Sequence, residues 1–193
     1  MRLVLAAAFL FTVTFASAQN TIDWDGVYVL QLSDFQASST QIGNVNAYSL
    51  HTPTGFDFLF QMTNAEFMFT KNFNSKVSCS FKRASASLIA ADSAMANELL
   101  NFARYTFDLS ELYARKFRKE LFEKKGAFSS AAFFQPIYDD IQKEYIERHD
   151  MAVKSTELGR KHNELATLHE EVRKEIADLP DFCKTCKPPK KKK

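Results

Sequence analysis

The most constraining feature of the sequence is a long stripe of mostly apolar residues in its C-terminal third. The stripe advances by alternating steps of three and four residues, through Met151, Ser155, Leu158, His162, Leu165, His169, Val172, Ile176 and Leu179. This heptad spacing is typical of an amphipathic helix that packs along another helix. We therefore predict a helix seam formed by Met151, Leu158, His162, Leu165, His169, Val172 and Ile176.

A second series with the same steps lies earlier in the chain. It runs through Asp92, Met95, Leu99, Phe102, Thr106, Leu109 and Tyr113. Between the two series, Lys124-Lys125-Gly126 is typical of a helix end, and Ser129 or Ser130 can cap the next helix. The two series predict an antiparallel helical hairpin, with arms of roughly 40 residues that each span about 60 Å.

Composition favours helices for the rest of the chain. Five glycines and five prolines are few for an all-β domain, and 19 phenylalanines suit the packing of helices. From Phe56 to Phe73, apolar residues at helical steps run further than a competing strand-like alternation. We predict an all-α fold: an elongated antiparallel helical hairpin, coiled-coil-like, with an irregular or small β N-terminal segment.

The chain divides into four segments. Residues 1–18 resemble a secretory signal, with Arg2, an apolar run and a predicted cleavage after Ala18; an uncleaved anchor is the alternative. Residues 19–54 are turn-rich and irregular, and 55–179 form the helical module. Residues 180–193 are a basic tail of Cys, Pro and Lys that is not expected to pack.

The basic character of the chain resides in this tail. Without Arg2 and the lysines at 187 and 190–193, 19 basic residues face 23 acidic ones, a net charge of −4. A short Lys-rich end attracts anionic lipid or nucleic acid at low salt, or keeps the terminus solvated. Because the tail is short and lacks a basic surface with aromatic residues, no nucleic-acid partner is expected.

Cysteine and histidine offer few sites for chemistry. Three cysteines cannot all pair within one chain, so one thiol is left over. Cys183 and Cys186 have the spacing of a redox motif, a zinc half-site or a local disulfide, and lipid attachment is also open. His162 and His169 are too far apart on a helix to share one ion, so no metal is predicted; a pH-sensitive seam and a functionless seam both remain open.

Patterns typical of enzymes are missing from the sequence. There is no Gly-x-Ser-x-Gly elbow and no phosphate-binding loop. The acid pairs Asp139-Asp140 and Glu170-Glu171 are consecutive, so their side chains point to different sides of a helix. We predict a protein without enzymatic activity and without a cofactor.

Several short motifs occur in the order found in F-BAR (FCH-type) membrane-binding domains. They are Gly55-Phe56-Asp57, Arg83-Ala84-Ser85, Leu99-Leu100-Asn101-Phe102-Ala103-Arg104, His162-Asn163-Glu164-Leu165-Ala166 and Glu170-Glu171. In these motifs, residues 55–193 resemble the N-terminal half of such a domain. The spacing before Leu99 is longer than the family pattern, and the two further long helices of the family are missing.

The resemblance implies a crescent-shaped dimer that binds anionic bilayers through basic helix faces. Arg83 and Arg104 match the family pattern, and further basic residues lie nearby on the same arm: Arg115, Lys116, Arg118 and Lys119. The expected partners are an anionic membrane surface and a second copy or another helical protein. This interpretation places the protein on the cytoplasmic face of the plasma membrane.

The N-terminal segment supports a different function. If residues 1–18 are removed as a signal, the product is a secreted, soluble helical protein with a binding role that the sequence does not assign. Because the two hypotheses require different compartments, the sequence leaves the location open between the cytoplasm and the exterior.

Overall fold

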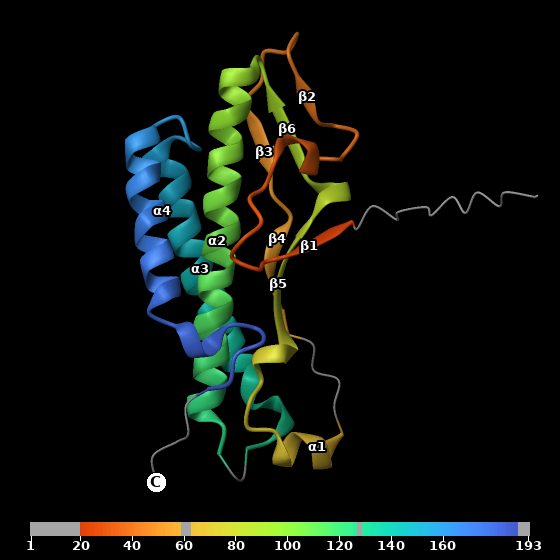
Figure 1. Ribbon diagram of the computed structural model, residues 1–193, viewed down its shortest axis with the longest axis vertical. Coiled ribbons are helices and arrows are strands. Elements are labelled where there is room, and N and C mark those ends of the chain that lie inside the picture. The colour runs from red at the N-terminus through yellow and green to blue at the C-terminus, as the bar shows by residue number, and fades with distance from the viewer. Residues whose placement is uncertain (1–19, 59–62, 127–128, 189–193) are drawn as a thin grey trace, which may run out of the picture.

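A computed structural model describes residues 20–58, 63–126 and 129–188, and it shows a mixed α/β fold (Figure 1). The long helix α2 (Ser93–Lys124) lies in the middle. Two small sheets cover one side of α2, and the helices α3 (Phe134–Thr156) and α4 (His162–Ala177) cover the other. The predicted all-α fold is therefore wrong.

The first sheet is antiparallel and has the order β1-β5-β4. It consists of β1 (Thr21–Asp23), β5 (Val77–Lys82) and β4 (Thr54–Phe58). The second sheet has the order β2-β6-β3, in which β2 (Gln41–Ile42) runs parallel to β6 (Ser87–Ala90) and β3 (Ser49–His51) runs antiparallel to it.

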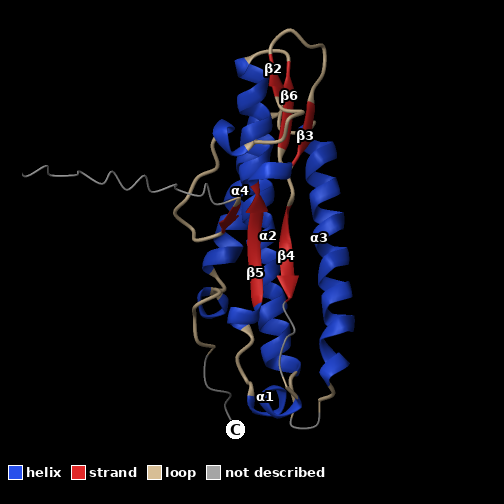
Figure 2. Cartoon of the chain, turned by 90° about the vertical axis from the view of Figure 1, so that its right-hand side faces the viewer, coloured by secondary structure: helices blue, strands red, loops and turns tan. Residues whose placement is uncertain are grey.

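The two sheets follow one another along α2, as Figure 2 shows for β3, β4, β5 and β6. The pair His51–Ser87 ends the second sheet and the pair Thr54–Phe81 begins the first. Between these pairs, the segment from β3 to β4 advances by three residues, whereas the segment from β5 to β6 advances by six. The three extra residues form the 3-10 turn η3 (Arg83–Ser85). This insertion separates what would otherwise be one long two-stranded ribbon into two sheets.

The strands β1, β2 and β3 lie in the segment 19–54, which was predicted as irregular or small β, whereas β4, β5 and β6 were not predicted because they are short. In β5, Val77, Cys79 and Phe81 point into the core while the serines between them are partly exposed. In β4, the alternation of Phe56 with Phe58 was the correct signal, although the helical spacing ran further. Helix follows later, in the short α1 (Asn64–Phe69). The F-BAR-like motifs at 55–57 and 83–85 therefore lie in β4 and η3.

The first arm of the predicted hairpin is confirmed as a helix. Asp92, the first residue of the series, is the N-cap of α2: its carboxylate accepts a hydrogen bond from the backbone N–H of Met95 at 2.9 Å. The helix ends at Lys124, two residues before Gly126. Its 32 residues span about 48 Å, shorter than the predicted arm.

The second arm is two antiparallel helices rather than one. Glu157, Leu158 and Gly159 all have positive φ, so the chain reverses between α3 and α4. A Cβ on Gly159 would lie 2.7 Å from the backbone oxygen of Glu98 in α2, which shows how closely this turn approaches the central helix. The seam predicted from Met151 to Ile176 is therefore divided between two helices.

The link between α2 and α3 differs from the expected serine cap. Ser130 precedes the 3-10 turn η4 (Ala131–Phe133) and makes no capping hydrogen bond, whereas Ser129 Oγ accepts a hydrogen bond from the N–H of Gly126. Pro136 is the third residue of α3. The first N–H groups of a helix have no partner within the helix, so the N–H that proline lacks is not needed there.

Aromatic rings fill the core where β4 meets α2 and α3. The ring of Phe117 lies 5.6 Å from that of Phe58 and 5.5 Å from that of Tyr138, and Phe58 lies 4.7 Å from Phe134. Phe56 of β4 is buried, and its ring also packs against those of Phe117 and Tyr138. The high phenylalanine content thus packs a helix-on-sheet core. None of the helices in the described part of the chain is long and apolar enough to cross a membrane.

The N-terminal and C-terminal segments both join this core. The segment after β1 includes the 3-10 turn η1 (Leu32–Asp34), and Leu30 and Phe35 on either side of it are buried. The segment after α4 includes the 3-10 turn η5 (Pro180–Phe182), with Phe182 buried. Contrary to the prediction, the start of the basic tail packs; residues 1–19 and 189–193, which include the signal-like segment and the terminal lysines, lie outside the described residues.

Candidate functional site

The six basic residues predicted to bind lipid do not form one surface. Arg83 Nε pairs with the buried carboxylate of Asp34 at 3.1 Å, and Arg104 Nε donates to the carbonyl oxygen of Leu30 at 2.9 Å. Lys116 and Lys119 are partly exposed beside α3 and α4, where Lys116 pairs with Glu175 at 3.2 Å. The structure therefore distributes these residues among separate environments.

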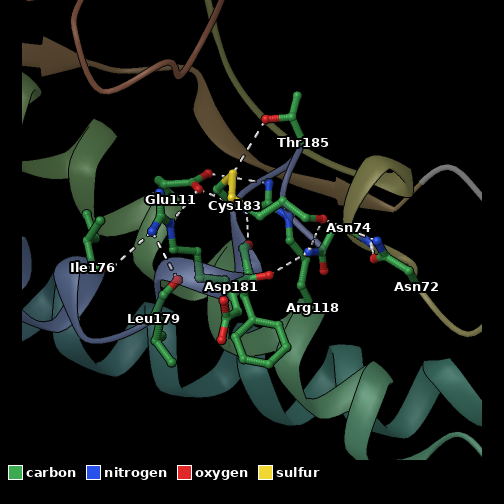
Figure 3. The surroundings of a disulfide bond; sticks show 12 residues. Asn72, Asn74, Glu111, Arg118, Ile176, Leu179, Asp181, Cys183 and Thr185 are labelled. Atoms are coloured by element: carbon green, nitrogen blue, oxygen red, sulfur yellow. Dashed lines mark hydrogen bonds and ion pairs between the residues drawn. A yellow bond between two sulfur atoms is a disulfide. The ribbon is translucent and has the colours of Figure 1, made fainter. Parts of the chain in front are cut away.

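Arg118 lies inside the protein beside the carboxylate of Glu111 (Figure 3), and Arg115 is buried beside the same carboxylate. Arg118 has 0% exposed side chain, and its Nη1 lies 2.8 Å from Glu111 Oε1. Arg115 Nε lies 2.9 Å from the same oxygen. Two buried guanidiniums thus share one carboxylate, so neither is available to a lipid surface in this conformation.

Backbone carbonyl oxygens accept further hydrogen bonds from the two arginines. Arg115 Nη1 donates to the carbonyl oxygens of Ile176 and Leu179, each at 3.0 Å. Arg118 donates to the carbonyl oxygens of Val77 at 2.9 Å and Phe182 at 3.0 Å. The pair therefore ties the C-terminal segment and β5 to α2, a structural role that the sequence pattern did not reveal.

A disulfide between Cys183 and Cys186 closes the segment that follows η5 (Figure 3). The carbonyl oxygen of Cys186 accepts hydrogen bonds from the amide nitrogens of Asn74 and Asn72, at 3.0 and 3.2 Å. Of the alternatives open for this Cys pair, the structure has the local disulfide. The leftover thiol is Cys79, and its burial raises its pKa well above the usual value.

The predicted seam residues have unequal environments. Val172 and Leu165 are buried and Ile176 nearly so, whereas Met151 is exposed, and Leu158 lies in the turn between α3 and α4. His162 is largely exposed near Glu98. The seam is thus a packing stripe of α4 that does not continue along α3.

His169 is held by an acid that the seam pattern did not indicate. The Asp108 carboxylate lies 2.7 Å from His169 Nε2, 2.8 Å from Trp24 Nε1 and 3.3 Å from Arg173 Nε. Burial acts to raise the pKa of Asp108, but the hydrogen bonds from His169 and Trp24 outweigh it, so this pKa lies below its usual value. The cluster joins α2, α4 and the segment after β1, and the contacts around Asp108 are those of a structural carboxylate.

The most exposed large apolar residue in a described helix is Phe69 of α1, at the lower end of the molecule in Figure 1. Thr63 Oγ1 caps α1 by accepting a hydrogen bond from the N–H of Glu66 at 3.1 Å. Phe67 anchors the helix, since its ring lies 6.1 Å from that of Phe73 and 5.7 Å from that of Phe133. The next two residues point away: Met68 is 63% exposed and Phe69 is 82% exposed.

Two lysines contact α1, and a third lies just after it in the chain. Lys125 Nζ, just after α2, lies 4.3 Å from the centroid of the Phe67 ring, which places the end of α2 beside α1. Lys76 pairs with Glu66 at 3.6 Å, and Lys71 is exposed. Residues 63–76 and 119–126 together carry five lysines and three glutamates, a net charge of +2. We call this surface the α1 end and define it by Met68, Phe69, Lys71, Lys76, Lys124 and Lys125.

The sequence held one usable signal for the α1 end. Phe67, Met68 and Phe69 are consecutive, and three consecutive side chains cannot all face one side of a helix. In a helix of six residues, one of them packs and the others must be exposed. The longer helical pattern predicted from Phe56 to Phe73 gives no indication that Met68 and Phe69 are exposed.

Comparisons with protein-family models, curated proteins and solved structures give no match to this chain. Among the described residues, no group of three or more His, Cys, Asp or Glu side chains is placed to hold a metal ion. A functional proposal for this chain therefore depends on its own surfaces.

Proposed function

We propose that this protein binds anionic lipid bilayers peripherally, through the α1 end. The observation that carries the proposal is the exposure of Met68 and Phe69, adjacent residues of a helix at the tip of the molecule that Lys76 and Lys125 contact. Apolar side chains that enter the boundary of a bilayer, together with nearby basic residues, are the usual composition of an interfacial anchor. The proposal keeps the lipid partner predicted from the sequence and assigns it to a different surface.

The expected affinity is modest. Full burial of a Phe or Met side chain contributes roughly 1.5–3 kcal/mol. A lysine near an anionic membrane contributes about 1 kcal/mol, and salt weakens that attraction. Because Lys76 and Lys124 are paired with Glu66 and Glu120, their contribution is smaller than that of Lys71. Binding that is reversible and salt-sensitive follows from these magnitudes.

The predicted dimer along the hairpin is not part of this proposal. The sheets and the α3–α4 pair cover most of α2 on opposite sides, so the long open seam of a two-helix hairpin is not available to a second copy (Figure 1). Arg115 and Arg118, which would have supplied the basic face of a crescent, support the fold instead. The α1 end can contact a bilayer from a single chain.

Sedimentation of the chain from residue 19 onward with lipid vesicles tests the proposal. Vesicles of phosphatidylcholine with about 30% phosphatidylserine should bind the protein, and pure phosphatidylcholine should bind it much less. The double variant Met68→Ser/Phe69→Ser should reduce binding at least about tenfold, since it removes more than 1.4 kcal/mol of apolar transfer free energy. The matched control is Ile146→Ser/Met151→Ser, which removes two exposed apolar side chains from α3.

Charge reversal separates the lysines from general electrostatics. Lys71→Glu/Lys124→Glu should weaken binding, whereas Lys143→Glu/Lys154→Glu on α3 makes the same change in net charge away from the α1 end and should have little effect. Equal losses in the two double variants, or wild-type binding that ignores both salt and phosphatidylserine, would refute the proposal. Binding to another protein through Met68 and Phe69, without binding to lipid, would refute it as well.

A second proposal, that the protein is secreted, draws support from the disulfide. Disulfides persist in oxidising compartments and are rare in the cytosol. Cys183 and Cys186 are joined, and residues 1–18 have the composition of a signal. Expression in animal cells should give a product in the medium that starts at Gln19. Retention in the cytosol with Met1 intact would refute secretion and leave the lipid test unaffected.

A further inference from the structure

A groove of about 520 Å³ runs between α2, α3 and the C-terminal end of α4. It is separate from the α1 end, although Lys124 borders both. Its lining combines charged and apolar side chains: Lys116, Lys119, Glu120, Lys124, Ile137, Asp140, Ile141, Glu144, Glu175, Asp178 and Leu179. Its volume is within the range of ligand-binding clefts.

The groove exists because α4 is shorter than the two helices on which it packs. Lys116 pairs with Glu175 and Arg115 binds the carbonyl oxygens of Ile176 and Leu179, so α4 ends about two turns before the end of α2. Pro180 then turns the chain away into η5. Beyond that point, α2 continues to Lys124, and α3 covers it from Phe134 onward without a third helix among the described residues.

The floor of the groove continues the apolar contact that α4 makes. Ile137 and Ile141, one turn apart on α3, line the groove with only 5% and 6% of their surface exposed, and Leu179 lines it just after α4. Such a trough between two neighbouring helices is the position in which a further amphipathic helix packs. The shape therefore favours a helical segment over a globular surface.

The two walls of the groove differ in charge. Lys116 pairs with Glu175, Lys119 with Glu123 and Lys124 with Glu120, so the lysines of the α2 wall have acidic partners. On the opposite wall, Asp140 and Glu144 lie one turn apart on the face of α3 that also carries Ile137 and Ile141. Within the described part of the chain neither carboxylate forms an ion pair, and the same holds for Asp178 at the end of α4.

We infer that the groove binds an amphipathic helix of a partner protein, with an apolar stripe on Ile137 and Ile141 and a basic edge along Asp140 and Glu144. Lysines or arginines four residues apart on that helix match the spacing of the two carboxylates. Their aliphatic stems cover the isoleucines while their charged heads reach the acidic wall. This site assigns a chemistry to the helical partner that the sequence suggested, and it does not depend on lipid binding.

Two synthetic peptides test the inference. The first is a capped amphipathic helix of about 14 residues, roughly four turns, with a leucine stripe and lysines four residues apart on one edge. The second is identical except that glutamates replace those lysines. Fluorescence anisotropy with the chain from residue 19 onward should show binding of the lysine peptide at least about tenfold tighter than the glutamate peptide.

Charge reversal in the groove provides the decisive comparison. Asp140→Lys/Glu144→Lys should reverse the preference between the two peptides. Glu147→Lys/Asp150→Lys changes the net charge equally on an exposed part of α3 outside the groove and should leave the preference intact. Circular dichroism checks that both variants remain folded. Equal loss in the two variants, or no binding of the lysine peptide to the wild type, would overturn the inference.

Discussion

Replacing Glu111 by glutamine removes the negative charge between two buried guanidiniums. Glu111 Oε1 lies 2.8 Å from Arg118 Nη1 and 2.9 Å from Arg115 Nε, and all three residues are buried. Glutamine keeps the size of the side chain but offers one carbonyl oxygen and an NH₂ group that donates toward N–H groups. The substitution therefore leaves positive charge without a counter-ion in the interior.

The magnitude follows from the contacts that are lost. Each hydrogen bond to a charged group contributes about 1.5–3 kcal/mol, and removing one member of a buried ion pair costs about 3–5 kcal/mol. The carbonyl oxygens of Val77, Phe182, Ile176 and Leu179 still bind the guanidiniums, so the lower part of this range applies. We expect Glu111→Gln to lower the free energy of unfolding by about 3 kcal/mol.

Urea denaturation followed by circular dichroism measures this loss in the oxidised protein. The matched control is Glu147→Gln, which removes an exposed carboxylate of α3 that pairs with Lys143 at 4.0 Å and should cost less than about 1 kcal/mol. If Glu111→Gln also costs less than about 1 kcal/mol, the buried network does not hold the C-terminal segment and β5 to α2. The structural role assigned to Arg115 and Arg118 would then be refuted.

Three further perturbations have definite outcomes. Gly159→Ala should destabilise by about 1–3 kcal/mol in thermal denaturation, because φ is +97° and the new Cβ would lie 2.7 Å from the oxygen of Glu98; an unchanged melting temperature would contradict the fold of this turn. Cys183→Ser/Cys186→Ser should lower stability by roughly 2 kcal/mol in the same urea assay, as expected for a short closed loop, and unchanged stability would show that the disulfide does not stabilise the C-terminal segment. Burial lowers the pKa of His149 below 6.5, so the unfolded chain takes up a proton first as the pH falls, and the free energy of unfolding should decrease below about pH 6.5. His149→Gln should make the free energy of unfolding less dependent on pH in that range. An equal slope in both proteins would exclude His149 as the cause.

Local pattern was sufficient to predict elements whose signals lie close together in the chain. The three-and-four steps after Asp92 and the Lys124-Lys125-Gly126 stop located α2, because a helix depends on contacts one turn apart. The odd cysteine count correctly required one free thiol, and the Cys183–Cys186 disulfide was one of the alternatives that the spacing left open. These inferences needed no knowledge of which segments meet in space.

The same pattern failed where a distant partner decided the outcome. The apolar stripe through Leu158 is continuous in the sequence, yet the chain reverses there and Gly159 packs closely against Glu98 of α2. The spacing of apolar residues carries no information about that contact. The strands were missed because β4 and β5 are short and stabilise each other through hydrogen bonds across the sheet.

The candidate sites show the same division. From the sequence alone, the position of α2, the charged residues and the leftover thiol could be predicted. Tertiary structure decided that Arg115 and Arg118 face Glu111 inside the protein while Phe69 is exposed at its tip. Burial depends on which surfaces pack together, and a local pattern does not contain that information. Because α2 is covered on both sides, even its charged residues Arg115 and Arg118 become buried, where a carboxylate and backbone carbonyl oxygens bind them.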